Sequence, residues 1–512
     1  MSHPPFRIQP LDRTAFILAA VLMVAIALLA LSGDHTAPRI RDFSWQDRQV
    51  GAEDTAFLLT FSRPMNWESV EQNLKLDPPL PGKFSWAGRR MAYTLEAPAP
   101  YGTEFQLQLQ GARDRFTPPE DTRRQMPLFT GRFQTRDRAF VYLGVQGEEA
   151  GRLVLENLTR KEHRILTPAN LVVMDYEPYP EGDRILFSAS DRSAEFGALD
   201  QQIYTVTTGV QPLAPAKSPD EMKTGTRVAA QKAQPPGIVT VVLDSRDYQN
   251  LKFDLAPNGE FLIVQRVNRK NPADFGLWFV REGQPPQPIQ TEPGGDFLIT
   301  PDSASIAMAQ GQGMAILPLA TQEGVAGDPL DFLPRFGMVL NFSQDGAAAA
   351  MVKFNPNPDN PTRSLFLVTS TGVEKELFQT TGSILMAQFD PTKTLLYCLV
   401  TVRLPGDTFV EQPYIVAVNL ENLERIKLLE LPIQRDVQMS LAPDGLGILF
   451  DQVVAAADDQ QPTAGAIQGS DGKAIASSRL WFLPLVINES GNPNPVEAKE
   501  LPLRGLRPRW LP

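Results

Sequence analysis

Cysteine and histidine are scarce: 512 residues include one cysteine and three histidines. The lone thiol, Cys398, lies in the apolar run 395–400, so no intramolecular disulfide can form, and a buried small side chain in a strand is expected. His3, His35 and His163 are far apart in the sequence, which excludes a histidine-based metal cluster. We expect His163 to be exposed on a strand, and we predict no metal and no cofactor.

Basic clusters and catalytic motifs are missing as well. The chain has 48 basic and 59 acidic residues, a net charge of −11, and no long basic run after the N-terminus, so nucleic acid is not an expected partner. It lacks a G-x-S-x-G nucleophile motif. The acidic pairs Asp458-Asp459 and Glu148-Glu149 lie in polar segments where solvation keeps carboxyl groups ionised, and Gly311-Gln312-Gly313 is expected to form a hairpin. The sequence therefore predicts a protein that is not an enzyme, with no catalytic, cofactor or metal residues and with unknown ligand-binding residues.

One long apolar segment is present at the N-terminus. Residues 14–32 read TAFILAAVLMVAIALLALS without a charge, and a helix of this length would span about 28 Å. Arg7 and Arg13 precede it, so the positive-inside rule predicts a cytoplasmic tail at 1–13 and export of the remainder. A signal peptide cleaved after Ala30 to Ser32 is the alternative. We predict a single-pass anchor in the inner (plasma) membrane, with the bulk of the chain periplasmic or extracellular.

Residues 37–137 alternate between apolar and polar side chains. Phe57, Leu59 and Phe61 fall on one strand face, as do the apolar residues of 105–109, and this alternation between Pro and Gly clusters indicates an antiparallel sandwich. Pro64 is expected to end the first of these strands and to let Met65 pack inward.

Several residues of this region resemble the bacterial Ig-like domains of surface-layer and other exported proteins. The resemblance rests on Phe61-Ser62-Arg63-Pro64-Met65-Asn66, Ser69-Val70, Trp86, Tyr93, Gly102-Thr103 and the closing Phe133-Gln134-Thr135, with Phe105 in place of a tyrosine frequent in the family. It implies an Ig-like β-sandwich of about 100 residues.

A repeated turn marks the rest of the chain, 139–512. It recurs six times, as Tyr179-Pro180-Glu181-Gly182, Ala256-Pro257-Asn258-Gly259, Thr300-Pro301-Asp302-Ser303, Ser343-Gln344-Asp345-Gly346, Asp390-Pro391-Thr392-Lys393 and Ala442-Pro443-Asp444-Gly445. The second turn residues are 77, 44, 43, 47 and 52 positions apart. Removing a polar insert predicted at 213–246 reduces the interval of 77 to 43, and removing a second at 455–478 reduces the 69 positions between Pro443 and Pro512 to 45. This period is the length of a four-stranded propeller blade.

The two ends of this repeat region complement each other. The C-terminal run 506–511 looks like the strand before one more such turn, whereas the segment beginning at Phe140 lacks a first strand. We predict that they pair and close a ring of seven blades. The turns and strands resemble propellers of the TolB and WD-repeat-like classes, so the expected fold is all-β: a transmembrane helix, an Ig-like sandwich and a β-propeller.

This architecture predicts a binding or scaffolding protein of the cell envelope. The partners would be the membrane, through the N-terminal helix, and a protein or glycan at the propeller face. Aromatic rings beside amides at the propeller mouth would favour glycan, and apolar patches would favour protein. The alternative is a propeller enzyme, a lyase or glycan hydrolase that uses carboxylates.

Overall fold

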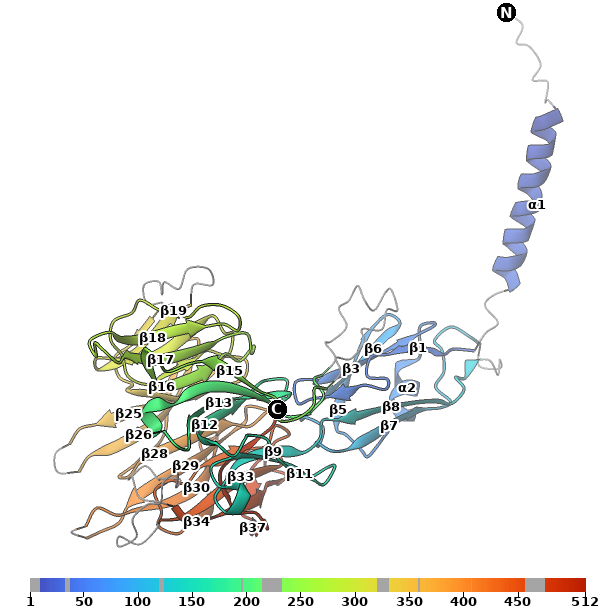
Figure 1. The fold of residues 1–512 in the computed structure, drawn as a ribbon. Coiled ribbons are helices and arrows are strands. Elements are labelled where there is room, and N and C mark those ends of the chain that lie inside the picture. Colours follow the sequence, from blue (N-terminus) through green and yellow to red (C-terminus); the bar gives the residue numbers. More distant parts are fainter. Residues whose placement is uncertain are drawn as a thin grey trace, which may run out of the picture. The chain divides into compact units, whose positions relative to one another are not determined.

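The computed structural model describes residues 10–32, 37–118, 124–194, 197–213, 233–319, 331–357, 360–406, 408–455 and 475–512. The chain divides into two compact units. The smaller unit comprises 1–47, 56–94 and 105–132, and the larger unit comprises 48–55, 95–104 and 133–512. Figure 1 labels their elements.

The first element is helix α1 (Pro10–Ser32), which contains the apolar segment 14–32. Its Ala- and Leu-rich sequence has high helix propensity. Among the described residues, no helix is both long and apolar enough to cross a membrane.

Two four-stranded sheets and a short helix follow. The strand orders are β1–β3–β6–β5 and β2–β8–β7–β4. The elements are β1 (Ile40–Phe43), β2 (Gln49–Val50), β3 (Ala56–Phe61), α2 (Trp67–Asn73), β4 (Leu74–Asp77), β5 (Gly82–Ala87), β6 (Arg90–Leu95), β7 (Glu104–Leu109) and β8 (Phe129–Thr135). Strands β2 and β8 pair in parallel, whereas β1 with β3, β3 with β6, and β4 with β7 pair antiparallel.

The alternation predicted for these strands is present. Phe57, Leu59 and Phe61 of β3 are buried, and the same holds for the predicted face of β7. Met65 is also buried, as expected after Pro64. Helix α2 was not predicted; it begins because the Asn66 side chain accepts a hydrogen bond from the Ser69 amide at 2.9 Å.

The described residues of the larger unit form seven four-stranded sheets, numbered 1 to 7 along the chain. Their strands are β38 (Gly505–Trp510), β9 (Ala139–Gly144), β10 (Leu153–Asn157) and β11 (Glu162–Ile165) in sheet 1; β12 (Leu171–Pro178), β13 (Arg184–Asp191), β14 (Gln202–Thr207) and β15 (Val239–Leu243) in sheet 2; β16 (Tyr248–Leu255), β17 (Leu262–Asn268), β18 (Phe275–Val280) and β19 (Gln287–Pro288) in sheet 3; and β20 (Phe297–Ile299), β21 (Ser305–Gln310), β22 (Gly313–Pro318) and β23 (Asp331–Leu333) in sheet 4.

Sheets 5 to 7 continue the pattern. Their strands are β24 (Met338–Phe342), β25 (Ala348–Asn355), β26 (Thr362–Thr369) and β27 (Glu374–Thr380); β28 (Ile384–Phe389), β29 (Leu395–Arg403), β30 (Glu411–Asn419) and β31 (Arg425–Glu430); and β32 (Met439–Leu441), β33 (Gly447–Ala455), β34 (Ile475–Pro484) and β37 (Lys499–Glu500). A two-stranded ribbon, β35 (Val486–Ile487) and β36 (Pro493–Asn494), precedes β37. Two short 3₁₀ helices lie at Gly147–Glu149 and Gly197–Asp200.

The first strands of neighbouring sheets contact one another, from β16 through β20, β24, β28 and β32 to β38. They are therefore the inner strands of the unit. Antiparallel four-stranded sheets that follow one another around their inner strands have the topology of a β-propeller.

The predicted pairing of the two chain segments that close the ring is confirmed. Strand β38 pairs antiparallel with β9, with Leu506 opposite Leu143 and Trp510 opposite Phe140. Figure 1 shows the C-terminus beside β9. The C-terminal segment thus supplies the inner strand that β9, β10 and β11 lack.

The repeated turns share one geometry. In all six, the fourth residue donates its amide to the carbonyl of the first, at distances of 2.7–2.9 Å. That fourth residue has a positive φ in every turn, which explains the glycine at four of the six positions. Ser303 and Lys393 adopt the same conformation without that advantage.

The bounds predicted for both inserts include residues that belong to strands. Strand β15 lies inside 213–246, and its sequence, VTVVL, supplies the fourth strand of sheet 2. Strands β33 and β34 extend into both ends of 455–478. The alternation typical of a strand could not be recognised in β15, because the segment around it is rich in Pro and Lys. Residues 214–232 and 456–474 lie outside the described residues.

Candidate functional site

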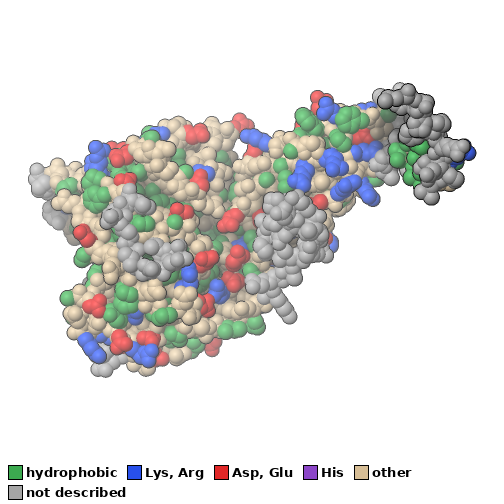
Figure 2. Space-filling model, turned by 90° about the horizontal axis from the view of Figure 1, so that it is seen from above, with side chains coloured by type: hydrophobic (Ala, Val, Ile, Leu, Met, Phe, Trp, Pro, Cys, Tyr) green, Lys and Arg blue, Asp and Glu red, His purple; other side chains and the backbone are tan. Residues whose placement is uncertain are grey.

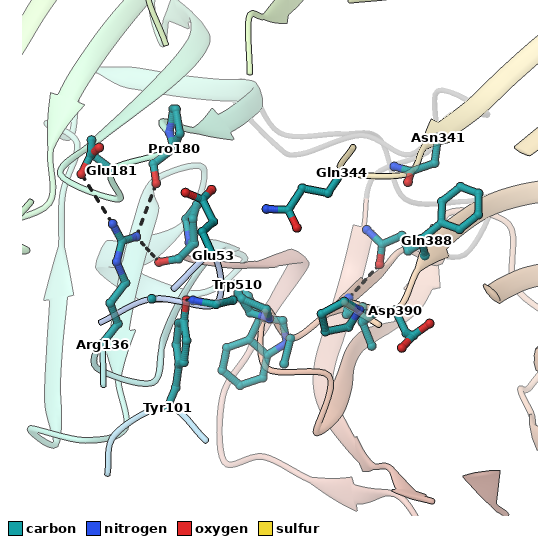
Figure 3. A pocket seen from close by; sticks show the side chains of 18 of the residues that line it. Glu53, Tyr101, Arg136, Pro180, Glu181, Asn341, Gln344, Gln388, Asp390 and Trp510 are labelled. Carbon is teal, nitrogen blue, oxygen red and sulfur yellow. Dashed lines mark hydrogen bonds and ion pairs between the residues drawn. The ribbon is translucent and has the colours of Figure 1, made fainter. Parts of the chain in front are cut away.

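A cavity of about 390 Å³ lies where turns of the larger unit converge. Its walls come from the turns after β12, β24, β28 and β32, from the end of β38, and from the short segments 48–55 and 95–104. Figure 3 shows the side chains that line it. We term it the mouth cavity and define it by Tyr101, Arg136, Asn341, Gln344, Gln388 and Trp510.

Each inner strand carries an equivalent side chain three positions before the second residue of its turn, and two of these side chains, Asn341 and Gln388, line the cavity. Six of the seven are polar, and we term the set the ring residues: Glu177, Asp254, Leu298, Asn341, Gln388, Ser440 and Arg509. Five of the inner strands, β12, β16, β24, β28 and β38, shift register shortly before this position. Such bulges redirect the following side chains.

Four ring residues tie neighbouring sheets together. Each accepts a hydrogen bond from a backbone amide of the next inner strand: Glu177 from Leu255 at 3.0 Å, Asp254 from Ile299 at 2.6 Å, Gln388 from Leu441 at 2.7 Å, and Ser440 from Trp510 at 3.1 Å. Every donor occupies the same position, two residues before the second turn residue. The side chains therefore satisfy backbone donors that no strand partner reaches.

The junction between sheets 1 and 2 departs from this rule on both sides. Its ring residue, Arg509, has no acceptor, and the residue that would donate from β12 is Pro178, which has no amide hydrogen. The missing acceptor and the missing donor therefore fall at the same junction, so no backbone donor is left without its partner there. Arg509 instead lies 3.8 Å from the Asp175 carboxylate.

Sheet 5 departs from the repeat at two positions. The side-chain amide of its ring residue, Asn341, forms no hydrogen bond to any described residue, unlike that of Gln388 in sheet 6. Gln344 stands where all five other complete turns have proline, and its side-chain amide is also unpartnered among the described residues. In Figure 3 the Gln344 side chain reaches across the cavity. Sheet 5 thus supplies two uncommitted amides.

Aromatic side chains form much of the remaining wall. Tyr101, Phe342, Phe389 and Trp510 all line the cavity. Tyr101 is held by its backbone amide, which donates to Asp444 at 2.9 Å, and its hydroxyl accepts from the Ala52 amide at 3.0 Å. Burial raises the pKa of Tyr101 to about 12, so it stays neutral. The Trp510 indole N–H has no partner among the described residues, although the side chain is only 7% exposed.

The charged groups of the cavity differ in how far they are engaged. The Arg136 guanidinium donates through Nη1 to the carbonyl oxygens of Pro180 and Pro512 and lies 3.6 Å from Glu181, while its Nε is buried without a partner among the described residues. Asp390 accepts hydrogen bonds from the amide and hydroxyl of Thr392 in its own turn and from the amide of Leu395 at the start of β29. Glu53 is exposed and has no hydrogen bond or ion pair with the described residues. The uncommitted charge in the cavity is therefore negative.

Burial perturbs three carboxyl groups of the ring region. It raises the pKa of Glu177, with the Asp254 carboxylate acting in the same direction and Arg509 opposing it. It also raises the pKa of Asp254, against the hydrogen bond from Ile299. Asp451 of β33 is fully buried, and its pKa rises to about 7 although the Arg507 and Gln438 amides donate to it. These carboxyl groups join strands, so their first role is structural.

Comparisons with known proteins assign no family. No protein-family model matches the chain, and no curated protein matches it.

Solved structures similar to the chain include several propeller-type proteins. TolB from Acinetobacter baumannii is 12% identical, with 76% of this chain and 84% of that chain covered and a TM-score of 0.36. An oligogalacturonate lyase from Vibrio parahaemolyticus is 11% identical, with 70% and 92% covered and a TM-score of 0.42. A putative 6-phosphogluconolactonase from Bacteroides uniformis is 11% identical, with 73% and 99% covered and a TM-score of 0.41. TolB belongs to the class that the turns resemble, but scores this low carry no argument about function.

The described residues that the sequence analysis weighed as chemical groups, Cys398, His163 and Gly311-Gln312-Gly313, do not line the mouth cavity. Cys398 is fully buried in β29, as expected. His163 is exposed on β11 and hydrogen-bonds Glu149 and Glu156 at 2.8 Å each. Gly311-Gln312-Gly313 forms the predicted hairpin turn between β21 and β22. Asp458-Asp459 lies outside the described residues.

The cavity residues themselves were not predicted. Among the described residues, no group of three or more His, Cys, Asp or Glu side chains is arranged to hold a metal ion. On the face of the larger unit in Figure 2, Lys and Arg side chains are scattered among Asp and Glu. One sequence signal did point to the cavity: the glutamine that replaces the turn proline at 344.

Proposed function

We propose that this protein is a single-pass membrane protein of the cell envelope that binds a protein or glycan partner at the mouth cavity without transforming it. In this proposal residues 14–32 anchor the chain in the inner membrane, with 1–13 in the cytoplasm; the support comes from the sequence, in which 14–32 carries no charge and follows Arg7 and Arg13. Residues 37–137 are an Ig-like sandwich, and the seven sheets are the seven blades of a closed propeller outside the cytoplasm.

The observation that carries the binding role is the set of uncommitted polar groups in the mouth cavity. The amides of Asn341 and Gln344 and the Glu53 carboxylate have no partner among the described residues. Gln344 and Glu53 are exposed and Asn341 is half-buried, so these three groups are accessible to a ligand. A few convergent polar groups beside aromatic walls are typical of a ligand site.

Site-specific crosslinking in cells tests this role. We expect a photoreactive benzoylphenylalanine at position 344 to capture an envelope component. The matched control carries benzoylphenylalanine at position 302 instead. Asp302 is exposed in the equivalent turn of sheet 4 and lies outside the cavity. Absence of an adduct at 344, or equal adducts at both positions, would contradict the proposal.

Protease accessibility tests the proposed topology. Protease added outside the inner membrane should degrade the chain beyond residue 33 while a cytoplasmic marker stays intact. Protection of the larger unit under these conditions would place it in the cytoplasm and exclude the proposed orientation.

A carboxylate-based enzyme is the second candidate. The raised pKa values of Glu177 and Asp254 favour it, because perturbed carboxyl groups are frequent in active sites. However, both side chains accept backbone hydrogen bonds that hold sheets together. Turnover of an envelope glycan that is lost in Glu177→Gln while the melting temperature is retained would establish the enzyme and displace the binding role.

A further inference from the structure

We propose that the mouth cavity recognises one end of a neutral or amino-bearing carbohydrate, and that it discriminates against acidic sugars. This inference rests on the proposed binding function and names the chemical class of its ligand. Gln344 is assigned as the residue that determines this specificity.

Amide side chains argue for a hydroxylated ligand. Each amide has two N–H donors and an acceptor oxygen, which suits sugar hydroxyl groups that donate and accept at once. Asn341 and Gln344 keep all of these groups available, and Gln388 keeps its N–H donors because only its oxygen is engaged. The three amides come from the adjacent sheets 5 and 6, so they address one side of a ligand together.

The repeat shows that Gln344 is not required by the turn. Pro180, Pro257, Pro301, Pro391 and Pro443 occupy the equivalent position. The turn hydrogen bond from Gly346 to Ser343 has the same form as in those turns, and the Gln344 amide donates no backbone hydrogen bond. Proline would fit this position and provide no hydrogen-bonding group. The glutamine therefore contributes to the cavity rather than to the fold.

Aromatic rings supply the complementary apolar contact. Pyranose rings present C–H groups on their faces, and aromatic side chains combine apolar area with polar edges. Tyr101, Phe342, Phe389 and Trp510 share the cavity with the three amides.

The charged groups of the cavity determine whether acidic, neutral or amino-bearing sugars can bind. An acidic sugar would need an accessible cation, but Nη1 of Arg136 donates to two carbonyl oxygens, Nη2 lies 3.6 Å from Glu181, and Nε is buried from solvent. The Glu53 carboxylate remains uncommitted and would repel a uronate and attract an ammonium group. The cavity, at about 390 Å³, lies near the lower end of the range for small-ligand sites, about 300–1,000 Å³. That size suits a chain end better than a protein surface.

The test is calorimetric titration of the full chain, solubilised in a zwitterionic detergent without a sugar headgroup. The three probes are chitotetraose, which is neutral, its fully deacetylated form, which carries amino groups, and tetragalacturonate, which is acidic. We expect the first two to bind and the third not to bind. Glu53→Gln should weaken the deacetylated probe more than chitotetraose.

Gln344→Pro is the decisive variant because it restores the residue used by the other turns. We expect its melting temperature to be unchanged and its dissociation constant for chitotetraose to rise about tenfold, as for the loss of one or two hydrogen bonds. Pro301→Gln, the reverse change in a turn outside the cavity, should leave binding unchanged.

Three outcomes would overturn the inference. Tetragalacturonate binding as tightly as chitotetraose would refute the charge argument, and unchanged affinity in Gln344→Pro would refute the role of that residue. Failure of all three probes, together with a protein adduct at position 344 in cells, would refute the carbohydrate class while the proposed binding function stands. Failure of the probes without any specific adduct would refute both.

Discussion

Trp510 packs edge to face against Phe140, with ring centroids 5.5 Å apart and an interplanar angle of 72°. The two residues also face each other in the pairing of β38 with β9. A second ring, Phe482 of sheet 7, lies 6.2 Å from Trp510. The indole therefore joins the last and first sheets of the propeller.

Deletion of 504–512 should cause aggregation or a large drop in melting temperature. The deletion removes the inner strand of sheet 1, leaves β9 with an unpaired edge and exposes the cluster around Phe140 and Tyr142. Trp510→Ala should destabilise the full chain by about 3–5 kcal/mol. Phe116→Ala, at a side chain 74% exposed, is the control and should change stability by less than about 0.5 kcal/mol. Melting of the deletion variant at the temperature of the full chain would disprove closure.

Gly505→Ala should destabilise the same junction by about 1–3 kcal/mol. A Cβ at this position would overlap the Tyr142 ring and lie 2.9 Å from the Leu143 carbonyl oxygen. Gly276 in β18 has open space around its Cβ position and no positive φ, so Gly276→Ala is the matched control. Chemical denaturation of the two variants checks the difference, and equal midpoints would count against the close approach of β38 to β9.

Asp451 should make the protein less stable as the pH rises from about 4 to about 7. Burial raises the pKa of this carboxyl to about 7 in the folded state, above its ordinary value of 3.8. The folded state therefore binds more protons than the unfolded state within this window, and the free energy of unfolding falls with increasing pH. Glu177 and Asp254 act in the same direction.

Denaturation of the wild type and of Asp451→Asn at several pH values tests this dependence. The variant should lose part of the slope. It should also be less stable by about 1–3 kcal/mol, because the new amide group would face one of the two backbone donors, from Gln438 and Arg507. Identical slopes in the two proteins would exclude Asp451 as the titrating group.

His163 should titrate above the ordinary histidine pKa of 6.5. Partial burial lowers the pKa, but hydrogen bonds to Glu156 and Glu149 outweigh that effect. The resulting contribution to stability is present below the unfolded pKa and is lost as the pH rises through the folded pKa. Glu149→Gln and Glu156→Gln should each lower the pKa measured by NMR. A pKa that does not respond to either variant would show that the pair is not formed in solution.

Much of the larger unit could be predicted because its repeated turns require particular residue types at fixed positions. Proline at the second turn position and glycine at the fourth are visible in the sequence, and their spacing gives the strand order. Closure by 506–511 was predictable because that run matches the strand before a turn. Strand β15 was missed because it has five residues and no turn of the repeated type beside it.

The mouth cavity was beyond prediction for a different reason. Its residues come from strands separated by tens to hundreds of positions, and the register shifts that aim the ring residues depend on pairing rather than on local propensity. Helix α2 was missed because its cap, Asn66, falls within a motif that resembles a sandwich turn. Gln344 alone could be recognised from the sequence, because it occupies a turn position at which the other five turns have proline.

The pairing of Gly505 with Gly144 means that the first propeller sheet can be completed only after the end of the chain has been synthesised. The two partners are some 360 residues apart, and at about 5–20 residues per second translation needs roughly 20–70 s to cover that distance. During this interval β9 has been made but its partner has not, so a nascent chain carries an open edge on its first propeller sheet. Stalling or premature termination late in the message would leave that edge available to a second chain, and we expect strand exchange between neighbouring nascent chains to be the main misfolding route.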